Sequence, residues 1–231
     1  MGDLRVGGTF GFWHGATVAV PGAGSAAVAA ARAWQTAPVS GRPIIFVTGG
    51  SRGIGAATAT MAAGRGYDVA ITFVRDRAAA DDVVAECVRA GAHALAVRCD
   101  VAVESDVVAA FEEVRDQLGV PAAVVVNAGT LHRAARLDEF DIDRLRDVVA
   151  VNVVGAIVTA REAVRCMSTR HGGAGGSIVT VSSAASYLGL TRTFPLGVYS
   201  ASKATGVGSF GWRKVASCPC GRYHECCLSC G

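Results

Sequence analysis

Two residues near the carboxyl end of the sequence, Tyr199 and Lys203, have the types and the spacing to perform acid–base chemistry. They lie four residues apart, which places both side chains on one face of a helix. A tyrosine hydroxyl has a reference pKa of ~10, so it exchanges protons near neutral pH only when a cation stabilises its phenolate. Lys203 would supply that cation. It is one of two lysines among 22 basic residues, the other being Lys214, so a lysine at this position indicates a specific chemical task.

A glycine-rich turn, Thr48–Gly55, has the pattern of a phosphate-binding loop. Gly49 permits a tight turn, Gly53 lets a pyrophosphate approach the backbone, and Gly55 lets the following helix pack closely on the sheet. The helix N-terminus would then present free N–H groups and a partial positive charge to the phosphates. A plain tight turn is the alternative, but the strand expected before it and the helix expected after it favour a nucleotide site.

The end of the second expected strand indicates which nicotinamide cofactor this turn would serve. An NAD site places an acid there to bind the ribose hydroxyls, whereas this chain has Thr72-Phe73-Val74-Arg75 and no acid before Asp76. Arg52 in the turn and Arg75 after the strand could together hold a 2′-phosphate, a bidentate task suited to guanidinium groups. The pattern therefore favours NADP and leaves NAD possible; the alternative is that both arginines are solvated surface charges.

The elements that must position these groups follow from a regular apolar pattern across residues 43–203. Each expected strand is a short apolar run, and the first three expected helices are each followed by a glycine. The expected strands are 44–47, 69–73, 94–97, 122–126 and 177–181, and the expected helices are 54–65, 77–90, 104–118 and a long helical region over 141–168. Strands that are apolar on both faces and alternate with helices predict a doubly wound parallel sheet in an α/β fold. Ligands of such folds bind at the carboxyl ends of the strands.

Together these motifs resemble the classical short-chain dehydrogenase/reductase family, whose members join a T-G-x-x-x-G-x-G turn to a catalytic Asn, Ser, Tyr and Lys. The resemblance covers about residues 43–210, and the motifs occur in the family's order. The candidate cofactor residues are Thr48, Gly49, Ser51, Arg52, Gly53, Ile54 and Gly55 in the turn, Asp100 and Val101 after the third strand, Asn127, Ala128 and Gly129 after the fourth, Tyr199 and Lys203, and, on its charge and position alone, Arg75 after the second strand. The matched catalytic residues are Asn152, Ser183, Tyr199 and Lys203. One departure is Val126, where the family's strand-end motif has a first asparagine.

The resemblance implies a Rossmann-like fold and an NADP-dependent oxidoreductase that interconverts a carbonyl and an alcohol by hydride transfer. It implies that Tyr199 exchanges the proton and that Lys203 lowers the pKa of Tyr199 and binds the nicotinamide ribose. Asn152 would position a proton-relay water, and the acid after the third strand would contact adenine. Ser183 would hold the carbonyl oxygen, with the adjacent Ser182 as the alternative, because spacing does not distinguish the two. A small-molecule substrate and a homodimer or homotetramer are further implications.

Composition excludes several other classes of protein. The 231 residues are 51% hydrophobic and 18% charged, which is too apolar for a disordered chain. A scattered net charge of +3 does not suggest a nucleic-acid partner, and no window has the unbroken apolar run of about eighteen residues that a membrane span needs. Single, scattered cysteines at 87, 99 and 166 are typical of a reducing compartment, so we expect a cytoplasmic protein. No metal site is expected in this part of the chain.

The two ends of the chain differ from the domain between them. Residues 1–42 are rich in glycine and alanine, and we expect an unstructured extension there. We expect the domain at 43–210 to be incomplete, because no further apolar strand follows it and three glycines would interrupt its last helix, Gly206, Gly208 and Gly211. The tail, 211–231, holds five of the eight cysteines. It fits a zinc site, a disulfide cluster or an aberrant end to a longer reductase, and the abrupt change in composition favours the last.

Three hypotheses for function remain open on these grounds. The chain is an NADP-dependent oxidoreductase, a truncated homologue that binds nucleotide weakly and does no catalysis, or, more remotely, a metal-binding module built on the cysteine-rich tail.

Overall fold

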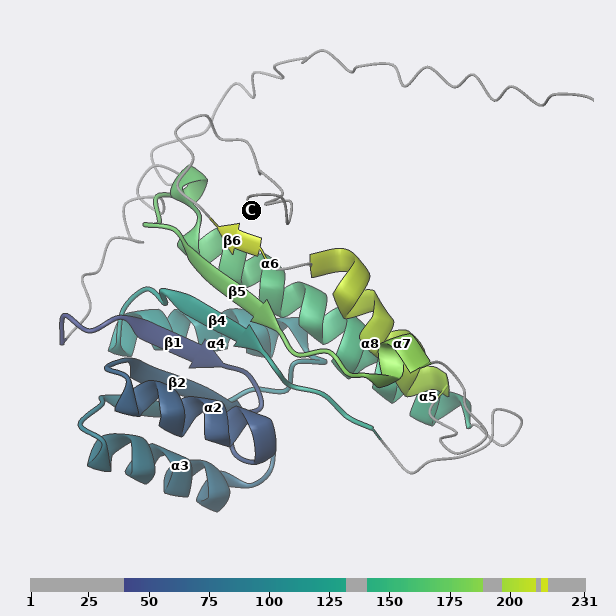
Figure 1. The fold of residues 1–231 in the computed structure, drawn as a ribbon, viewed down its shortest axis with the longest axis horizontal. Helices are drawn as coiled ribbons and strands as arrows, with labels where there is room; N and C mark the ends of the chain where they lie inside the picture. Colours follow the sequence, from purple (N-terminus) through teal and green to yellow (C-terminus); the bar gives the residue numbers. More distant parts are fainter. Residues whose placement is uncertain (1–39, 132–140, 189–196, 211–212, 216–231) are drawn as a thin grey trace, which may run out of the picture.

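The structure is a computed structural model, and it describes residues 40–131, 141–188, 197–210 and 213–215 (Figure 1). The expected N-terminal extension up to residue 39, Gly211 and the cysteines of the tail lie outside the described residues. The elements in chain order are β1 (Ile44–Val47), α2 (Gly53–Gly64), β2 (Asp68–Phe73), α3 (Arg77–Arg89), β3 (Ala94–Arg98), α4 (Glu104–Gln117), β4 (Ala123–Val126), α5 (Ile142–Val149), the π-helix η2 (Ala150–Gly155), α6 (Ala156–Met167), the 3-10 helix η3 (Thr169–His171), β5 (Gly176–Thr180), α7 (Ala185–Leu188), α8 (Gly197–Phe210) and β6 (Arg213–Val215). None of the helices in these ranges is both long and apolar enough to cross a bilayer.

The strands form one sheet in the order β3-β2-β1-β4-β5-β6. β1 pairs in parallel with β2 and β4, β2 with β3, and β4 with β5, so the predicted doubly wound α/β fold is confirmed. From β1 the chain first builds outward to β3 and then crosses over to β4. This reversal places a topological switch point between β1 and β4, and ligands of open α/β sheets bind outside the carboxyl ends of the strands at such a point.

Both faces of the sheet are covered by helices, and the side chains of β1 alternate between the two layers. Ile44 and Phe46 belong to the core on the side of α4 and α6, and the Phe46 ring packs edge-on against Phe111 of α4, with 4.9 Å between centroids. Ile45 and Val47 belong to the core on the side of α2 and α3. Figure 1 shows this three-layer arrangement, with α8 and α7 beyond the carboxyl end of β5. Burial on both faces explains why the strands are continuous apolar runs.

The residue just before proline 43 ties the carboxyl ends of two helices together. Arg42 donates hydrogen bonds from Nε to the Gly66 carbonyl at 3.0 Å and from Nη2 to the Ala63 carbonyl at 3.1 Å, both at the end of α2. Its Nη1 donates to the Gly91 carbonyl, just after α3. The guanidinium also lies 3.7 Å from the carboxylate of Asp68, whose side chain is 1% exposed. A cation is favourable here because helix C-termini carry partial negative charge.

The end of the domain corrects one sequence-based expectation and adds one element that the sequence pattern did not reveal. First, α8 continues through Gly206 and Gly208 to Phe210. Each glycine costs about 1 kcal/mol relative to alanine in a helix, and α8 forms despite that cost while packed against α7, α5, η2 and β5. Second, a further strand follows: β6 pairs antiparallel with β5, with Gly176 opposite Val215. The three-residue strand Arg-Lys-Val has no apolar run, so the pattern did not reveal it, and it forms by pairing with the edge of β5.

Candidate active site

The glycine-rich turn is fastened to the end of β4 by two polar side chains. Thr48, which is 2% exposed, donates from Oγ1 to the Val125 carbonyl at 3.3 Å and accepts from the backbone N–H groups of Asn127 and Ala128 at 3.1 and 3.2 Å. In return, Asn127 Nδ2 donates to the carbonyls of Thr48 and Gly49 at 2.9 and 3.0 Å. The turn and the end of β4, both predicted to bind cofactor, therefore form one hydrogen-bonded unit at the switch point.

A buried threonine of β2 supports the same turn. Thr72 is 1% exposed, and its Oγ1 accepts from the N–H of Gly49 at 2.9 Å while its carbonyl accepts from Gly50 at 2.8 Å. Gly49 has a φ of +67°, and a Cβ there would lie 3.0 Å from the Cα of Ala128, so only glycine suits this position. Thr72 was not predicted as a site residue. The only feature of the sequence that distinguishes Thr72 is a hydroxyl inside an otherwise apolar strand. Threonines with no functional role also occur in such strands.

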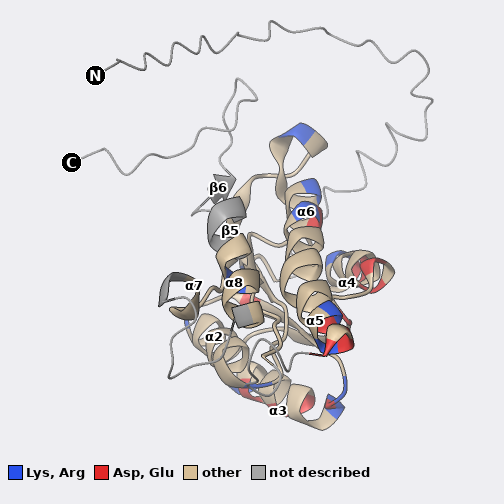
Figure 2. Cartoon of the chain, turned by 90° about the vertical axis from the view of Figure 1, so that its right-hand side faces the viewer, with Lys and Arg blue, Asp and Glu red and all other residues tan. Residues whose placement is uncertain are grey.

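The amino end of α2 has the properties of an anion site. No side chain caps the helix, its first turn has no acid, and Arg52 occupies the N-cap position. Figure 2 shows charged residues in blue and red along α4, α5 and α6, whereas α2 has no charged residue along its length. Gly53 has a φ of +57° and nothing within 4 Å of the position a Cβ would take, so space is open beside these N–H groups. Ser51 is half-buried, and Ile54 is 64% exposed at the same end of the helix.

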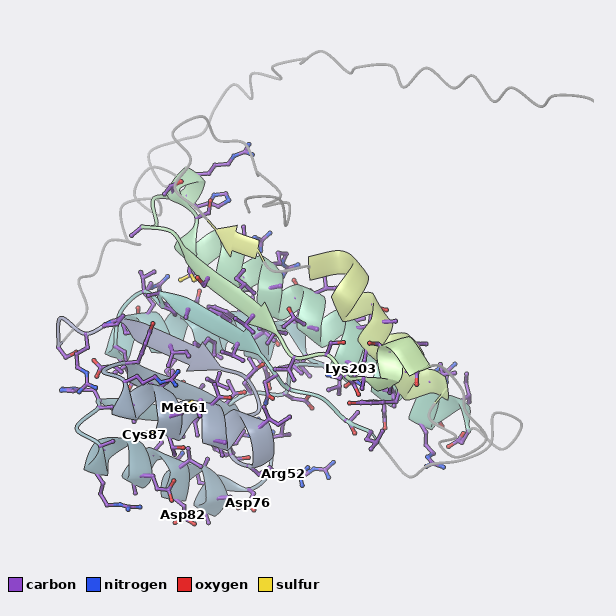
Figure 3. All side chains as sticks on the ribbon, viewed as in Figure 1. Arg52, Met61, Asp76, Asp82, Cys87 and Lys203 are labelled. Carbon is purple, nitrogen blue, oxygen red and sulfur yellow. The ribbon has the colours of Figure 1, made fainter. Side chains whose placement is uncertain are left out.

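The two arginines predicted to select NADP are both exposed. Neither Arg52 nor Arg75 has an ion pair with any residue in the described ranges, and Figure 3 shows Arg52 extending from the amino end of α2 into solvent. Asp76, the first acid after β2, is occupied as the N-cap of α3, where its carboxylate accepts from the Ala79 N–H at 2.9 Å. The neighbouring Arg77 is also engaged, in an ion pair with Asp81 at 2.9 Å.

The two residues after β3 have different local roles. Asp100 accepts from the Ala102 N–H at 3.0 Å, which closes a turn, and its own N–H donates to the Asp106 carboxylate at 3.1 Å. Val101 is 5% exposed, and a Cβ on Gly155 of η2 would lie 2.7 Å from its carbonyl oxygen. The loop after β3 thus packs tightly on the π-helix, and this contact requires the glycine.

Asn152 lies in the middle of the π-helix that interrupts the predicted long helical region. It is 4% exposed, and its amide is held by the backbone of Thr130, with Oδ1 accepting from the N–H and Nδ2 donating to the carbonyl, both at 2.8 Å. The second Nδ2 proton goes to the Ser202 hydroxyl of α8 at 3.0 Å. π-helical turns occur often at functional sites, and this one connects the end of β4 to α8.

Lys203 is buried where α8 meets the carboxyl end of the sheet (Figure 3). It is 8% exposed; its Nζ donates to the Val181 carbonyl at 3.0 Å and lies 6.0 Å from the ring centroid of Tyr199. A Cβ on Gly129 would lie 3.1 Å from Lys203 Nζ and 3.2 Å from Asn152 Oδ1, so both polar atoms border the same small space above this glycine. Burial lowers the pKa of Lys203, because desolvation penalises its charged form.

The adjacent serines after β5 differ in what their hydroxyls contact. Ser182 Oγ donates to the carbonyl of Lys203 at 3.0 Å, which holds the strand end against α8. Ser183 Oγ accepts from the Ala185 N–H at 3.2 Å, and no residue in the described ranges accepts its own proton. The structure therefore brings Asn152, Lys203 and Tyr199 together and leaves the Ser183 O–H available. The same ranges hold no group of three or more His, Cys, Asp or Glu side chains that could bind a metal.

The fold and the site define a class of protein, an α/β domain with a dinucleotide-binding turn at its switch point. The family model described as short chain dehydrogenase matches residues 43–211. The chain is 43% identical over 147 residues to the uncharacterized oxidoreductase YgfF of Escherichia coli (strain K12), covering 63% of this chain and 59% of that protein. It is 37% identical over 165 residues to a 3-oxoacyl-[acyl-carrier-protein] reductase of Rattus norvegicus, covering 71% of this chain and 65% of that protein. A solved short chain dehydrogenase from Burkholderia cenocepacia, in complex with NADP, is 38% identical with a TM-score of 0.63. The match covers 72% of this chain and 64% of that structure.

The chain belongs to the short-chain dehydrogenase/reductase family, whose members are oxidoreductases that bind NAD or NADP. This confirms the resemblance found in the sequence. The chain spans less than two thirds of the length of these three relatives.

Proposed function

We propose that this chain is an NADP-dependent oxidoreductase that interconverts a small-molecule carbonyl and its alcohol by hydride transfer. The observation that carries the proposal is the buried Lys203, whose Nζ lies beside both Asn152 Oδ1 and the Tyr199 ring. Burying an ammonium group costs free energy, because the charge is removed from water. A functional role explains why a lysine is kept at such a position. Stabilising a tyrosine phenolate is a role of this kind, and it matches the chemistry of the family.

The turn and the helix after it fit a nicotinamide dinucleotide. The uncapped N–H groups of α2 and the open space beside Gly53 suit a pyrophosphate, and the close approach of Gly49 to Ala128 brings the turn against the end of β4. When bound, the dinucleotide would supply or accept the hydride. Asp100 and Val101 would border its adenine, and the backbone of Ala128 and Gly129 would lie along its path toward Lys203.

Each catalytic side chain has a defined part in this proposal. Tyr199 would pass a proton to the substrate oxygen during reduction, and Lys203 would lower the pKa of Tyr199 through its positive charge. Ser183 would donate its O–H to the same substrate oxygen. We favour it over Ser182, because the Ser182 proton is already used on the Lys203 carbonyl. Asn152 would hold α8 and the end of β4 in register and present Oδ1 beside Lys203 for a relay water.

The preference for NADP is supported by the charges at the end of β2. Arg52 and Arg75 are exposed cations without an acidic partner in the described ranges, so both can face a 2′-phosphate. Asp76 is held at the N-cap of α3, where its carboxylate is already hydrogen-bonded. An NAD site requires an acid that binds the ribose hydroxyls, and Asp76 does not supply it.

The substrate class is proposed from the chemistry of the relatives. One is a 3-oxoacyl-[acyl-carrier-protein] reductase, and another, 37% identical over 161 residues, is a cis-4-hydroxycyclohexanecarboxylate dehydrogenase of Sinomonas cyclohexanicum. The first name describes a carbonyl group on an acyl chain and the second an alcohol on a carbon ring, so acetoacetyl-coenzyme A and 4-oxocyclohexanecarboxylate are suitable probes. We also propose a cytoplasmic location, since Cys87, Cys99 and Cys166 are buried free thiols, as a reducing compartment allows.

A homodimer or homotetramer is supported by apolar side chains that remain exposed on the long helical region. Val154 is 48% exposed and Ile157 is 42% exposed, on η2 and α6 respectively. A second copy of the chain would cover such side chains, which are otherwise unfavourable in water. Light scattering after gel filtration should give a mass at least twice that of the 23.5 kDa chain. A monomer mass at micromolar concentration would contradict this part of the proposal.

The activity is tested by following NADPH oxidation at 340 nm with the two probe carbonyls. The wild-type chain should turn over at least one of them. Tyr199→Phe keeps the ring but removes the proton donor, so its kcat should fall by about 10²–10⁴-fold, far more than any change in NADPH affinity. NADPH binding by the wild-type chain without turnover of either probe would contradict the proposal and favour a homologue that binds nucleotide but does no catalysis.

A further inference from the structure

A serine of α8 that the sequence motifs did not single out connects two parts of the candidate active site. Ser202 is 3% exposed and lies between Tyr199 and Lys203 on the same helix. Its Oγ accepts a hydrogen bond from Asn152 Nδ2 at 3.0 Å and donates one to the carbonyl of Tyr199 at 2.8 Å. The hydroxyl therefore joins the π-helix to the first turn of α8 through one atom.

This contact completes the hydrogen bonding of the Asn152 amide. Both protons of Nδ2 are used, one on the Thr130 carbonyl and one on Ser202, while Oδ1 accepts from the Thr130 N–H. An amide held by three bonds has one orientation. Its Oδ1 therefore keeps its place beside Lys203 Nζ, across the space above Gly129. Without the serine hydroxyl, one buried N–H of Asn152 would have no partner, and only the two bonds to Thr130 would hold the amide.

We propose that Ser202 is a positioning residue of the reaction, which it serves by fixing the Asn152 amide and the distance between η2 and the helix turn that carries Tyr199 and Lys203. This inference rests on the proposed function. Ser202 does not touch the substrate or the cofactor in this proposal; it acts through Asn152 and Tyr199. Its loss should slow the chemical step and leave nucleotide binding nearly unchanged, because the phosphate turn lies on different elements.

The chain offers a closely matched control two residues away. Ser200 is also on α8 and 6% exposed, but its Oγ has no hydrogen-bond partner in the described part of the chain. Replacing a buried hydroxyl that is unpaired removes no hydrogen bond, so Ser200→Ala should be neutral or slightly stabilising. The two substitutions remove the same atom from the same helix, and they differ in whether that atom holds Asn152.

The test compares the wild-type chain, Ser202→Ala, Ser200→Ala and Ser202→Cys, which fills a similar space with a weak hydrogen-bonding group. For each we would measure kcat with acetoacetyl-coenzyme A and 4-oxocyclohexanecarboxylate, the Kd of NADPH by fluorescence, and the unfolding midpoint. Ser202→Ala and Ser202→Cys should lower kcat by about tenfold, as expected for one buried hydrogen bond, with the Kd changed less than twofold. Ser200→Ala should keep the wild-type kcat and Kd.

The outcomes separate this inference from the function on which it rests. A wild-type chain that turns over neither probe overturns the proposed function and the role of Ser202 with it. A wild-type chain with turnover, whose Ser202 variants keep the kcat of Ser200→Ala, overturns only the role of Ser202. An equal loss of kcat and NADPH affinity in both Ser202 variants would also overturn it, since that result indicates a general loss of structure. If Ser202→Ala does not fold, Ser202→Cys decides the question.

Discussion

The two glycines at the ends of α2 should respond in opposite ways to the same substitution. A Cβ on Gly55 would lie 2.3 Å from the Gly49 carbonyl oxygen and 2.6 Å from Asn127 Nδ2, both inside the hydrogen-bonded unit that forms the phosphate turn. A Cβ on Gly64 would have nothing within 4 Å. Neither glycine has a positive φ, so backbone strain does not contribute to the difference.

The sizes of the two effects follow from this geometry. Contacts of 2.3 and 2.6 Å lie far inside van der Waals separation, and the first involves backbone, so α2 must move or the Asn127 contact must break. Overpacking of this kind costs about 1–3 kcal/mol, and loss of a buried hydrogen bond adds about 1 kcal/mol. Alanine at Gly64 should instead gain about 0.5 kcal/mol, from helix propensity and a less flexible unfolded chain. The two variants should therefore differ by about 2.5–4.5 kcal/mol.

Urea unfolding followed by circular dichroism measures both effects, and NADPH fluorescence titration measures the consequence for binding. Gly55→Ala should lower the unfolding free energy and weaken NADPH binding at least tenfold, because the turn and the first N–H groups of α2 are displaced. Gly64→Ala should keep the wild-type Kd. If Gly55→Ala binds NADPH like the wild-type chain, or if both variants change stability in the same direction, the role assigned to the turn is wrong.

Three other regions give predictions of the same kind. Replacing Arg42 by Met should lower the unfolding free energy in urea by about 2–4 kcal/mol, because a nearly buried carboxylate and helix-end carbonyls lose their cation; a change under 0.5 kcal/mol would contradict this. Arg52→Ala should raise the KM for NADPH about tenfold and leave that for NADH unchanged, whereas Arg77→Ala, which removes an engaged arginine, should alter neither. Burial raises the pKa of Cys99 to about 12 and of Cys166 to about 11, so the stability these thiols provide is complete below pH 9 and is lost as pH rises toward 11–12. Relative to Cys99→Ala, the wild-type chain should therefore lose at least about 1 kcal/mol between pH 9 and 11, and parallel pH profiles would refute this.

The central part of the fold was predictable because strands buried on both faces are continuous apolar runs, which are easily recognised in a sequence. The runs at 44–47, 69–73 and 122–126 are continuous apolar segments, and each reappears as a parallel strand within one residue at each end. The phosphate turn was predictable for a related reason, since part of what requires its glycines is the backbone geometry of the turn itself. Gly49 has a positive φ, and Gly55 sits against the turn itself.

Features that depend on long-range contacts were not predictable. Arg42 and Asp68 are ordinary charged residues in sequence, and only the fold brings the arginine to the ends of two helices. The π-helix around Asn152 has no signal in the helical pattern, and the close packing of its last residue, Gly155, against the loop after β3 joins residues far apart in sequence. β6 forms only through its pairing with β5.

The candidate site shows the same division between local and long-range information. Tyr199 and Lys203 were recognisable from a fixed spacing on one helix, whereas Ser202 between them was indistinguishable from any small helical residue. Its connection to Asn152 spans 50 residues of sequence. Likewise, the choice between Ser182 and Ser183 was open in the sequence, and the bond from Ser182 to the Lys203 carbonyl now favours Ser183 as the proposed substrate-binding serine.

The most direct test of the proposed function is the transfer of deuterium from NADPH that carries deuterium in place of both hydrogens at the nicotinamide C4 position. The wild-type chain, incubated with labelled NADPH and acetoacetyl-coenzyme A or 4-oxocyclohexanecarboxylate, should give an alcohol carrying deuterium on the former carbonyl carbon. Tyr199→Phe should give at most a trace of labelled product. Alcohol without deuterium, or equal labelling by Tyr199→Phe, would contradict hydride transfer assisted by Tyr199, and so would the absence of any labelled alcohol from the wild-type chain.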